Sequence, residues 1–182
     1  MGLMRFGRAA AAAAVVLVAA GGVLAAPSSA TEVGNSQGCT PGFWKNHQPW
    51  KPAYVQSAYT ADTELSDLFA KRNAPPPFTF TPYQFPAELA SFNAMTMDQA
   101  LQGGGGPGLA GATTILVRAA TAAYLNADAE IAYPYRRWTT GFDGLASLQS
   151  LVTAAVSSKD RATILALATT LDNANNLGCP LS

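Results

Sequence analysis

The chain has 182 residues, with 11 Lys and Arg balanced by 11 Asp and Glu, one histidine and two cysteines. A nearly neutral chain without a basic block argues against nucleic acid and anionic membranes as partners.

The first 30 residues have the pattern of a secretory signal peptide. Arg5 and Arg8 precede an unbroken run of Ala, Val, Leu and Gly from 9 to 26, and Ser28-Ser29-Ala30 offers small residues for cleavage. The run is rich in Ala and Gly, so it is weakly hydrophobic for a membrane span. We therefore predict that residues 1–30 are removed, that 31–38 form a flexible lead-in, and that the mature chain is secreted, with no membrane as a partner after cleavage.

The two cysteines, Cys39 and Cys179, lie near the two ends of the predicted mature chain. Two cysteines in an exported protein favour one disulfide, with two free thiols as the alternative. Such a bridge would make residues 39–182 a single disulfide-closed helical domain, whose size suits one hydrophobic core.

The segment after Cys39 is rich in proline and aromatic residues. Thr40-Pro41-Gly42 predicts a turn, and the prolines up to Pro52 predict irregular or briefly helical chain. Residues 62–72 predict a short helix, because acidic residues open it and Lys71 and Arg72 close it. Residues 73–86 predict an extended arm, because Pro82 and Pro86 exclude a central strand.

The second half of the chain has the periodicity of helices. Thr96 and Gln99 form a capping-box start, and a glycine run ends that helix. The apolar segment at about 110–127 predicts the buried centre of a bundle. A further helix is expected after Asp143. Ser158 is predicted to cap the last helix, which ends before Gly178. The predicted fold is all-α, with four or five helices packed around the 110–127 helix and the irregular aromatic segments wrapped outside.

Several apparent chemical motifs have simpler explanations. The glycines from 103 to 111 fit a dinucleotide-binding spacing, but the segment before them is helical, where such a site needs a strand. A single histidine cannot make a zinc site with disulfide-bonded cysteines. His47 could serve as a general base, although a structural histidine bonded to nearby backbone is the preferred interpretation. No catalytic residue, metal site or cofactor is predicted.

Aromatic residues are the most suggestive feature. Aromatic faces on a rigid support bind sugars and proteins, and the alternative is that these rings hold irregular chain onto the helices. Tyr133, Tyr135 and Trp138 stand beside Arg136 and Arg137, and an arginine stacked on a ring is the local alternative. Trp44 is expected to be more buried, because it lies close to the bridge. The predicted binding surface comprises Trp50, Tyr54, Tyr135 and Trp138.

The nonamer Cys-Thr-Pro-Gly-Phe-Trp-Lys-Asn-His at 39–47 and the closing Gly-Cys-Pro at 178–180 carry a family resemblance. Together with weaker likeness in between, they resemble an uncharacterised family of exported bacterial and archaeal modules with a CTPGYWKNH-type start. In this chain Phe43 stands where the family usually has tyrosine. The resemblance covers most of residues 38–181. It implies export and one compact domain, and it implies no activity and supplies no functional residues.

Three functions remain under consideration. The first is a secreted, non-catalytic extracellular domain with a structural or adhesive role, whose partner is another extracellular protein. The second is a module that binds cell-wall glycan through exposed aromatics. The third is a small secreted hydrolase that uses His47. Low charge and the lack of an assembled catalytic triad favour the non-catalytic hypotheses.

Overall fold

The structure is a computed structural model that describes residues 37–50, 55, 59–73, 77, 79–129, 131–137 and 147–181. All of them belong to the unit Thr31–Ser182. The predicted signal peptide, its cleavage point and residues 31–36 of the predicted lead-in lie outside the described residues.

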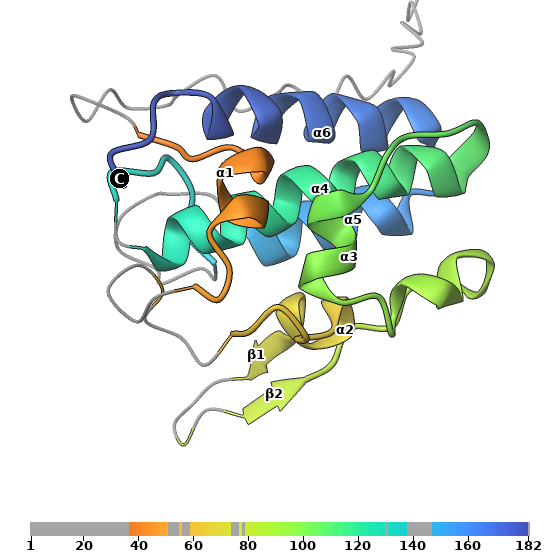
Figure 1. The fold of residues 1–182 in the computed structure, drawn as a ribbon. Helices are drawn as coiled ribbons and strands as arrows, with labels where there is room; N and C mark the ends of the chain where they lie inside the picture. The colour runs from red at the N-terminus through yellow and green to blue at the C-terminus, as the bar shows by residue number, and fades with distance from the viewer. Residues whose placement is uncertain are drawn as a thin grey trace, which may run out of the picture. The chain divides into compact units, whose positions relative to one another are not determined.

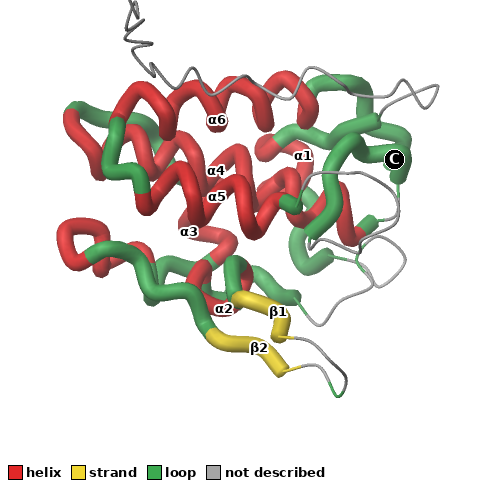
Figure 2. The backbone as a smooth tube through the Cα atoms, turned by 180° about the vertical axis from the view of Figure 1, so that it is seen from behind, coloured by secondary structure: helices red, strands yellow, loops and turns green. Residues whose placement is uncertain are grey.

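The central element is the long helix α4, Gly108–Asp128, which is buried on most of its faces. Other helices pack around it, and α6 runs alongside it in both views (Figures 1 and 2). These partners of α4 are α1 (Pro41–Asn46), α3 (Met97–Gln102), α5 (Leu148–Ser157) and α6 (Arg161–Asn175). The prediction of a central apolar helix covered by other helices is therefore confirmed.

Helix α4 has 21 residues and is apolar enough to cross a membrane by length and composition alone. Within its most apolar window, 61% of the helix is buried inside the domain. Leu116, Val117 and Leu125 on this helix are fully buried. Its apolar character is thus that of a core helix, which buries side chains on several faces at once.

The chain also contains a small two-stranded sheet, so the fold is mostly helical and not all-α. Strand β1 (Lys71–Asn73) pairs antiparallel with β2 (Thr79–Thr81), and Arg72 lies opposite Phe80. The predicted helix at 62–72 is wrong at both ends, because helix α2 covers only Leu65–Leu68. The side-chain amide of Asn73 donates to the hydroxyls of Thr79 at 3.3 Å and Thr81 at 3.0 Å, a cross-strand contact that favours the hairpin.

Aromatic rings before and after this hairpin pack the chain on both sides of it against the central helix. Phe69 packs edge-on against Tyr124 of α4, with ring centroids 5.4 Å apart, and against Phe85 at 6.2 Å. Phe85 in turn stacks on Phe92 at the end of the 3-10 helix η1 (Ala87–Phe92). Much of the aromatic chain before residue 93 is therefore core, and it holds irregular backbone in place through its large buried area.

Side-chain caps fix where the helices start. Thr96 and Gln99 form the predicted capping box of α3. Thr40 accepts from the Phe43 amide at 3.1 Å and begins α1, where the sequence had predicted a turn. Asp160, and not Ser158, caps α6, because Asp160 accepts from the Thr163 amide at 2.8 Å. The Ser158 hydroxyl instead donates back to the Ala155 carbonyl at 2.6 Å.

Candidate functional site

The two ends of the described domain are joined covalently. Cys39 and Cys179 form a disulfide across a sequence separation of 140, as predicted. Beside it, the amide of Gly38 donates to the carbonyl of Gly178 at 3.0 Å. A Cβ on Gly38 would collide with the Ala174 carbonyl, and Gly178 has a φ of +107° that side chains rarely adopt. Glycine is therefore required at both positions, at Gly38 to avoid this collision and at Gly178 to allow the positive φ.

Asn126, on α4, holds the segment after Cys39 in the interior. Its Oδ1 accepts from the Cys39 amide at 2.9 Å and from Trp44 Nε1 at 3.0 Å. Its Nδ2 donates to the Cys39 carbonyl at 2.9 Å and to Oδ1 of Asn175 at 2.9 Å. Both lone pairs and both hydrogens of this amide are thereby used, which is what a fully buried amide requires.

Asn175 completes the network from the end of α6. Its Oδ1 also accepts from the Tyr133 hydroxyl at 2.7 Å, and its Nδ2 donates to the Ala119 carbonyl at 2.9 Å. Burial raises the pKa of Tyr133 well above its usual range. Neither Asn126 nor Asn175 was singled out from the sequence. For Asn126 the available signal was its place in an otherwise apolar helical stretch, whereas Asn175 lies among polar residues at the end of α6 and gave no such signal.

The predicted binding surface is only partly within the described residues. Trp50 packs partly against the core, and its Nε1 donates to the Trp44 carbonyl at 3.0 Å. Tyr135 is half-buried, with its ring 5.7 Å from that of Tyr133. Tyr54 and Trp138 lie outside the described residues. Trp44 has no exposed surface, which confirms its expected burial. That a partner contacts these four residues first stays a prediction.

The basic side chain of Arg137 is engaged within the domain. Arg137 Nη1 pairs with the fully buried carboxylate of Asp128 at 2.6 Å. Its guanidinium carbon also lies 5.7 Å from the centroid of the Tyr59 ring. This is the arrangement of an arginine stacked on an aromatic ring, which was the local alternative to a binding role.

His47 is exposed and lies flat on Phe43, with ring centroids 4.0 Å apart. Its Nδ1 lies 2.7 Å from the Phe43 carbonyl. Because a carbonyl oxygen can only accept, Nδ1 carries the hydrogen and donates it. This contact matches the interpretation of His47 as a structural histidine, and a hydrolase that depends on it stays a hypothesis.

An open groove of about 490 Å³ lies between α5 and the hairpin region, by which we mean the β1–β2 hairpin together with residues 82–84 that follow it. One wall is formed by the start of β1, the end of β2 and the chain that follows β2, and the other wall is α5. Among the described residues that line it, Lys71 is the only one with a charged side chain. These residues are Lys71, Thr81, Pro82, Tyr83, Gln84, Gln149, Ser150, Thr153, Ala154 and Ser157.

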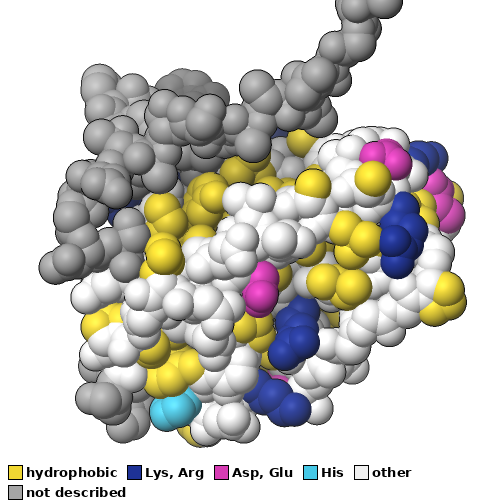
Figure 3. All heavy atoms as spheres, turned by 90° about the horizontal axis from the view of Figure 1, so that it is seen from above, with side chains coloured by type: hydrophobic (Ala, Val, Ile, Leu, Met, Phe, Trp, Pro, Cys, Tyr) yellow, Lys and Arg dark blue, Asp and Glu magenta, His cyan; other side chains and the backbone are white. Residues whose placement is uncertain are grey.

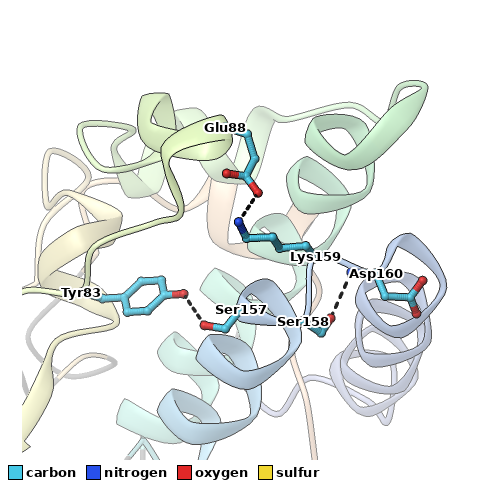
Figure 4. Close-up of polar contacts among 6 residues, drawn as sticks. All are labelled: Tyr83, Glu88, Ser157, Ser158, Lys159 and Asp160. Carbon is cyan, nitrogen blue, oxygen red and sulfur yellow. Dashed lines mark hydrogen bonds and ion pairs between the residues drawn. The ribbon is translucent and has the colours of Figure 1, made fainter.

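Two polar contacts link the chain after β2 to the end of α5 and the turn that follows it (Figure 4). The hydroxyl of Tyr83 lies 3.3 Å from that of Ser157, and Lys159 Nζ pairs with Glu88 Oε1 at 2.9 Å. The hydrogen bond from Lys159 lowers the pKa of the Glu88 carboxyl. Lys159 adopts a φ of +54°, which is uncommon for a residue with a side chain and reflects the tight turn between α5 and α6. The chain after β2 thus contacts the end of α5 and the turn that follows it.

The groove presents neutral hydrogen-bonding groups around an aromatic ring. Tyr83 is half-buried and packs edge-on against Phe85 at 5.0 Å, so its ring is held in place. Gln84 is exposed and Gln149 is half-buried, and each carries an amide that both donates and accepts. Tyr83 is not part of the binding surface predicted from the sequence. Its partner wall on α5 lies more than sixty residues further along the chain, so no local pattern indicates the groove.

Comparisons of the chain with protein-family models, curated protein sequences and solved structures found no significant match. The resemblance to the family of exported modules therefore stays a prediction.

Proposed function

We propose that the chain is an exported, non-catalytic domain that makes adhesive contacts outside the cell through the groove between the hairpin region and α5. The groove itself carries the proposal, because it is an open depression of about 490 Å³ whose two walls are linked by the contact between Tyr83 and Ser157. The disulfide supports an extracellular setting, since such bonds persist in oxidising compartments. The signal-peptide pattern of residues 1–30 points to the same compartment.

Glycan of the cell wall is the second candidate, and the chemistry of the groove favours it over a charged ligand. Sugar hydroxyls both donate and accept hydrogen bonds, which suits the hydroxyls and amides of this lining. The face of a sugar ring is apolar and packs on aromatic rings such as Tyr83. A groove with a single lysine offers little to a strongly anionic or cationic ligand.

Retention on insoluble cell-wall polysaccharide tests this proposal. We expect Gln149→Ala and Tyr83→Ala to reduce retention while the circular dichroism spectrum and the disulfide stay unchanged. Gln102→Ala is the matched control, because it removes an exposed glutamine of α3 outside the groove. Soluble polysaccharide should compete with retention if the partner is glycan. Retention on cells that is lost after protease treatment, and that is insensitive to polysaccharide, would assign the contact to a protein.

Alanine substitutions at Trp50 and Tyr135 provide the comparison with the aromatic surface predicted from the sequence. If these variants lose retention with the fold intact, while the groove variants keep it, the contact lies at the aromatic surface and not in the groove. If they only unfold the domain, their rings serve the core. A hydrolase screen with His47→Ala addresses the third hypothesis, since turnover abolished by this change with the fold intact would reverse the order of the proposals.

Export is tested separately. Protein recovered from the culture medium is expected to begin at or near Thr31 by mass spectrometry. A membrane-bound form that still begins at Met1 would contradict it.

A further inference from the structure

A second, smaller cleft of about 200 Å³ lies where α4 and α6 meet the start of α1. Pro41, Ile115 and alanines of both helices give it an apolar lining. Arg118 of α4 and Asp172 of α6 add one charge of each sign, and both side chains are exposed. On the side of the domain that carries α6, basic and acidic side chains lie scattered among apolar and uncharged ones (Figure 3). The cleft is therefore a place where opposite charges share an apolar surface.

The two helices that carry these charges are fixed to each other. The Asn175 side chain donates to the Ala119 carbonyl at 2.9 Å. Ala119 follows Arg118 directly, and Asn175 lies one turn of α6 beyond Asp172. This bond therefore joins α4 to α6 beside both charged residues. A site built on rigid helices holds its groups more closely in place than one built on loops.

Neither charge is neutralised by a neighbour. Within the part of the chain that the structure describes, Arg118 and Asp172 make no ion pair with each other or with another residue. The guanidinium and the carboxylate therefore stand beyond ion-pair distance of one another while they line the same cleft. Both charged groups are therefore available to a ligand that carries the two complementary charges.

We propose that this cleft binds the zwitterion of a free α-amino acid with an apolar side chain. The ligand carboxylate would pair with Arg118, whose planar guanidinium matches a carboxylate with two parallel hydrogen bonds. The ligand ammonium would pair with Asp172, and the apolar side chain would lie against Pro41 and Ile115. The cleft is smaller than the roughly 300–1,000 Å³ of sites for drug-sized ligands, which restricts it to a molecule of about this size.

Titration of the isotope-labelled protein with L-leucine, followed by NMR, tests the proposal on the wild-type chain. We expect saturable shifts at residues of the cleft, including Thr169. N-acetylleucine lacks the ammonium and leucine amide lacks the carboxylate, so each should bind about tenfold more weakly, as expected for the loss of one charged hydrogen bond. Equal shifts with all three compounds, or no saturable shift in the millimolar range, would overturn the proposal.

Variants assign the two charges. Arg118→Gln should remove the preference for leucine over leucine amide, and Asp172→Asn should remove the preference for leucine over N-acetylleucine. Arg161→Gln is the matched control, because Arg161 is an exposed arginine of α6 that does not line the cleft. If both cleft variants bind leucine as the wild type does, the ligand does not use these charges. The proposal is independent of the groove, so failure of either leaves the other standing.

Discussion

Asn126 and Asn175 share a hydrogen bond in the interior, where Nδ2 of Asn126 donates to Oδ1 of Asn175 at 2.9 Å. Through it, the segment that follows Cys39 is connected to both α4 and α6. The bond couples three parts of the chain that are far apart in sequence. The covalent closure at Cys39–Cys179 therefore lies beside a noncovalent one, and the two can be separated experimentally.

Removal of the Asn126 amide should be among the most destabilising single changes in the domain. Asn126→Ala leaves the Cys39 amide and Trp44 Nε1 buried without partners. Each orphaned group costs about 1–3 kcal/mol, so we expect the free energy of unfolding in urea to fall by about 2–6 kcal/mol. Asn173→Ala, at an exposed asparagine of α6, is the control and should change it little. Similar values for the two variants would show that the buried network adds nothing to stability.

The disulfide is expected to stabilise the domain without determining its helices. Closure of a loop of 140 residues stabilises by up to about 5 kcal/mol in the chain-entropy description. Cys39→Ser paired with Cys179→Ser should therefore lower the melting temperature while the helical circular dichroism signal below the transition persists, because Asn126 still holds the backbone of residue 39. Alkylation of the denatured, unreduced protein should label neither cysteine, and two labels per chain would contradict the bridge.

Two buried tyrosines form a matched pair. The Tyr133 hydroxyl donates to Asn175 at 2.7 Å, whereas the buried Tyr124 hydroxyl has no hydrogen-bond partner among the described residues. Tyr133→Phe should lower the free energy of unfolding by about 1–2 kcal/mol, while Tyr124→Phe should leave it unchanged or raise it by about 1 kcal/mol. Urea denaturation measures both. An equal loss in the two variants would mean that the Tyr124 hydroxyl makes a stabilising contact.

The same tyrosines predict a loss of stability in alkali. Burial raises the pKa of Tyr124 and of Tyr133 in the folded state, whereas the unfolded chain ionises these groups near pH 10. Above about pH 10 the unfolded state therefore holds fewer protons than the folded state, so the free energy of unfolding falls as the pH rises toward the folded pKa values. The Tyr124→Phe, Tyr133→Phe double variant should lose less stability than the wild type between about pH 9 and pH 11. Equal losses would show that other groups govern alkaline unfolding.

A glycine pair tests the close approach beside the disulfide. A Cβ on Gly38 would collide with the Ala174 carbonyl, while a Cβ on Gly104 would meet nothing within 4 Å. Gly38→Ala should lower the free energy of unfolding by about 1–3 kcal/mol, as forced overpacking does. Gly104→Ala should be nearly neutral. Thermal denaturation of the oxidised proteins compares them, and a neutral Gly38→Ala would show that the chain ends can separate without cost.

Features that depend on local chemistry were predictable from the sequence. Thr96 and Gln99 are three residues apart, so their capping box follows from spacing alone. Ile164, Ala168 and Leu171 share a face of α6 for the same reason and are buried. The Cys39–Cys179 bridge followed from there being only two cysteines in a chain expected to be exported.

Features that depend on distant partners required the tertiary structure. Lys71 and Arg72 suited the end of a helix by charge, but pairing with Thr79–Thr81 placed them in a strand, because cross-strand contacts outweigh the weak preferences of so short a segment. Asn126 meets Cys39 across 87 residues and Asn175 across 49, so no local pattern revealed their network. The groove likewise exists only because Tyr83 lies beside Ser157, 74 residues away. Sequence determined which segments would be helical and apolar, whereas packing determined which polar groups would meet, because hydrogen bonds across the core depend on how the helices lie against one another.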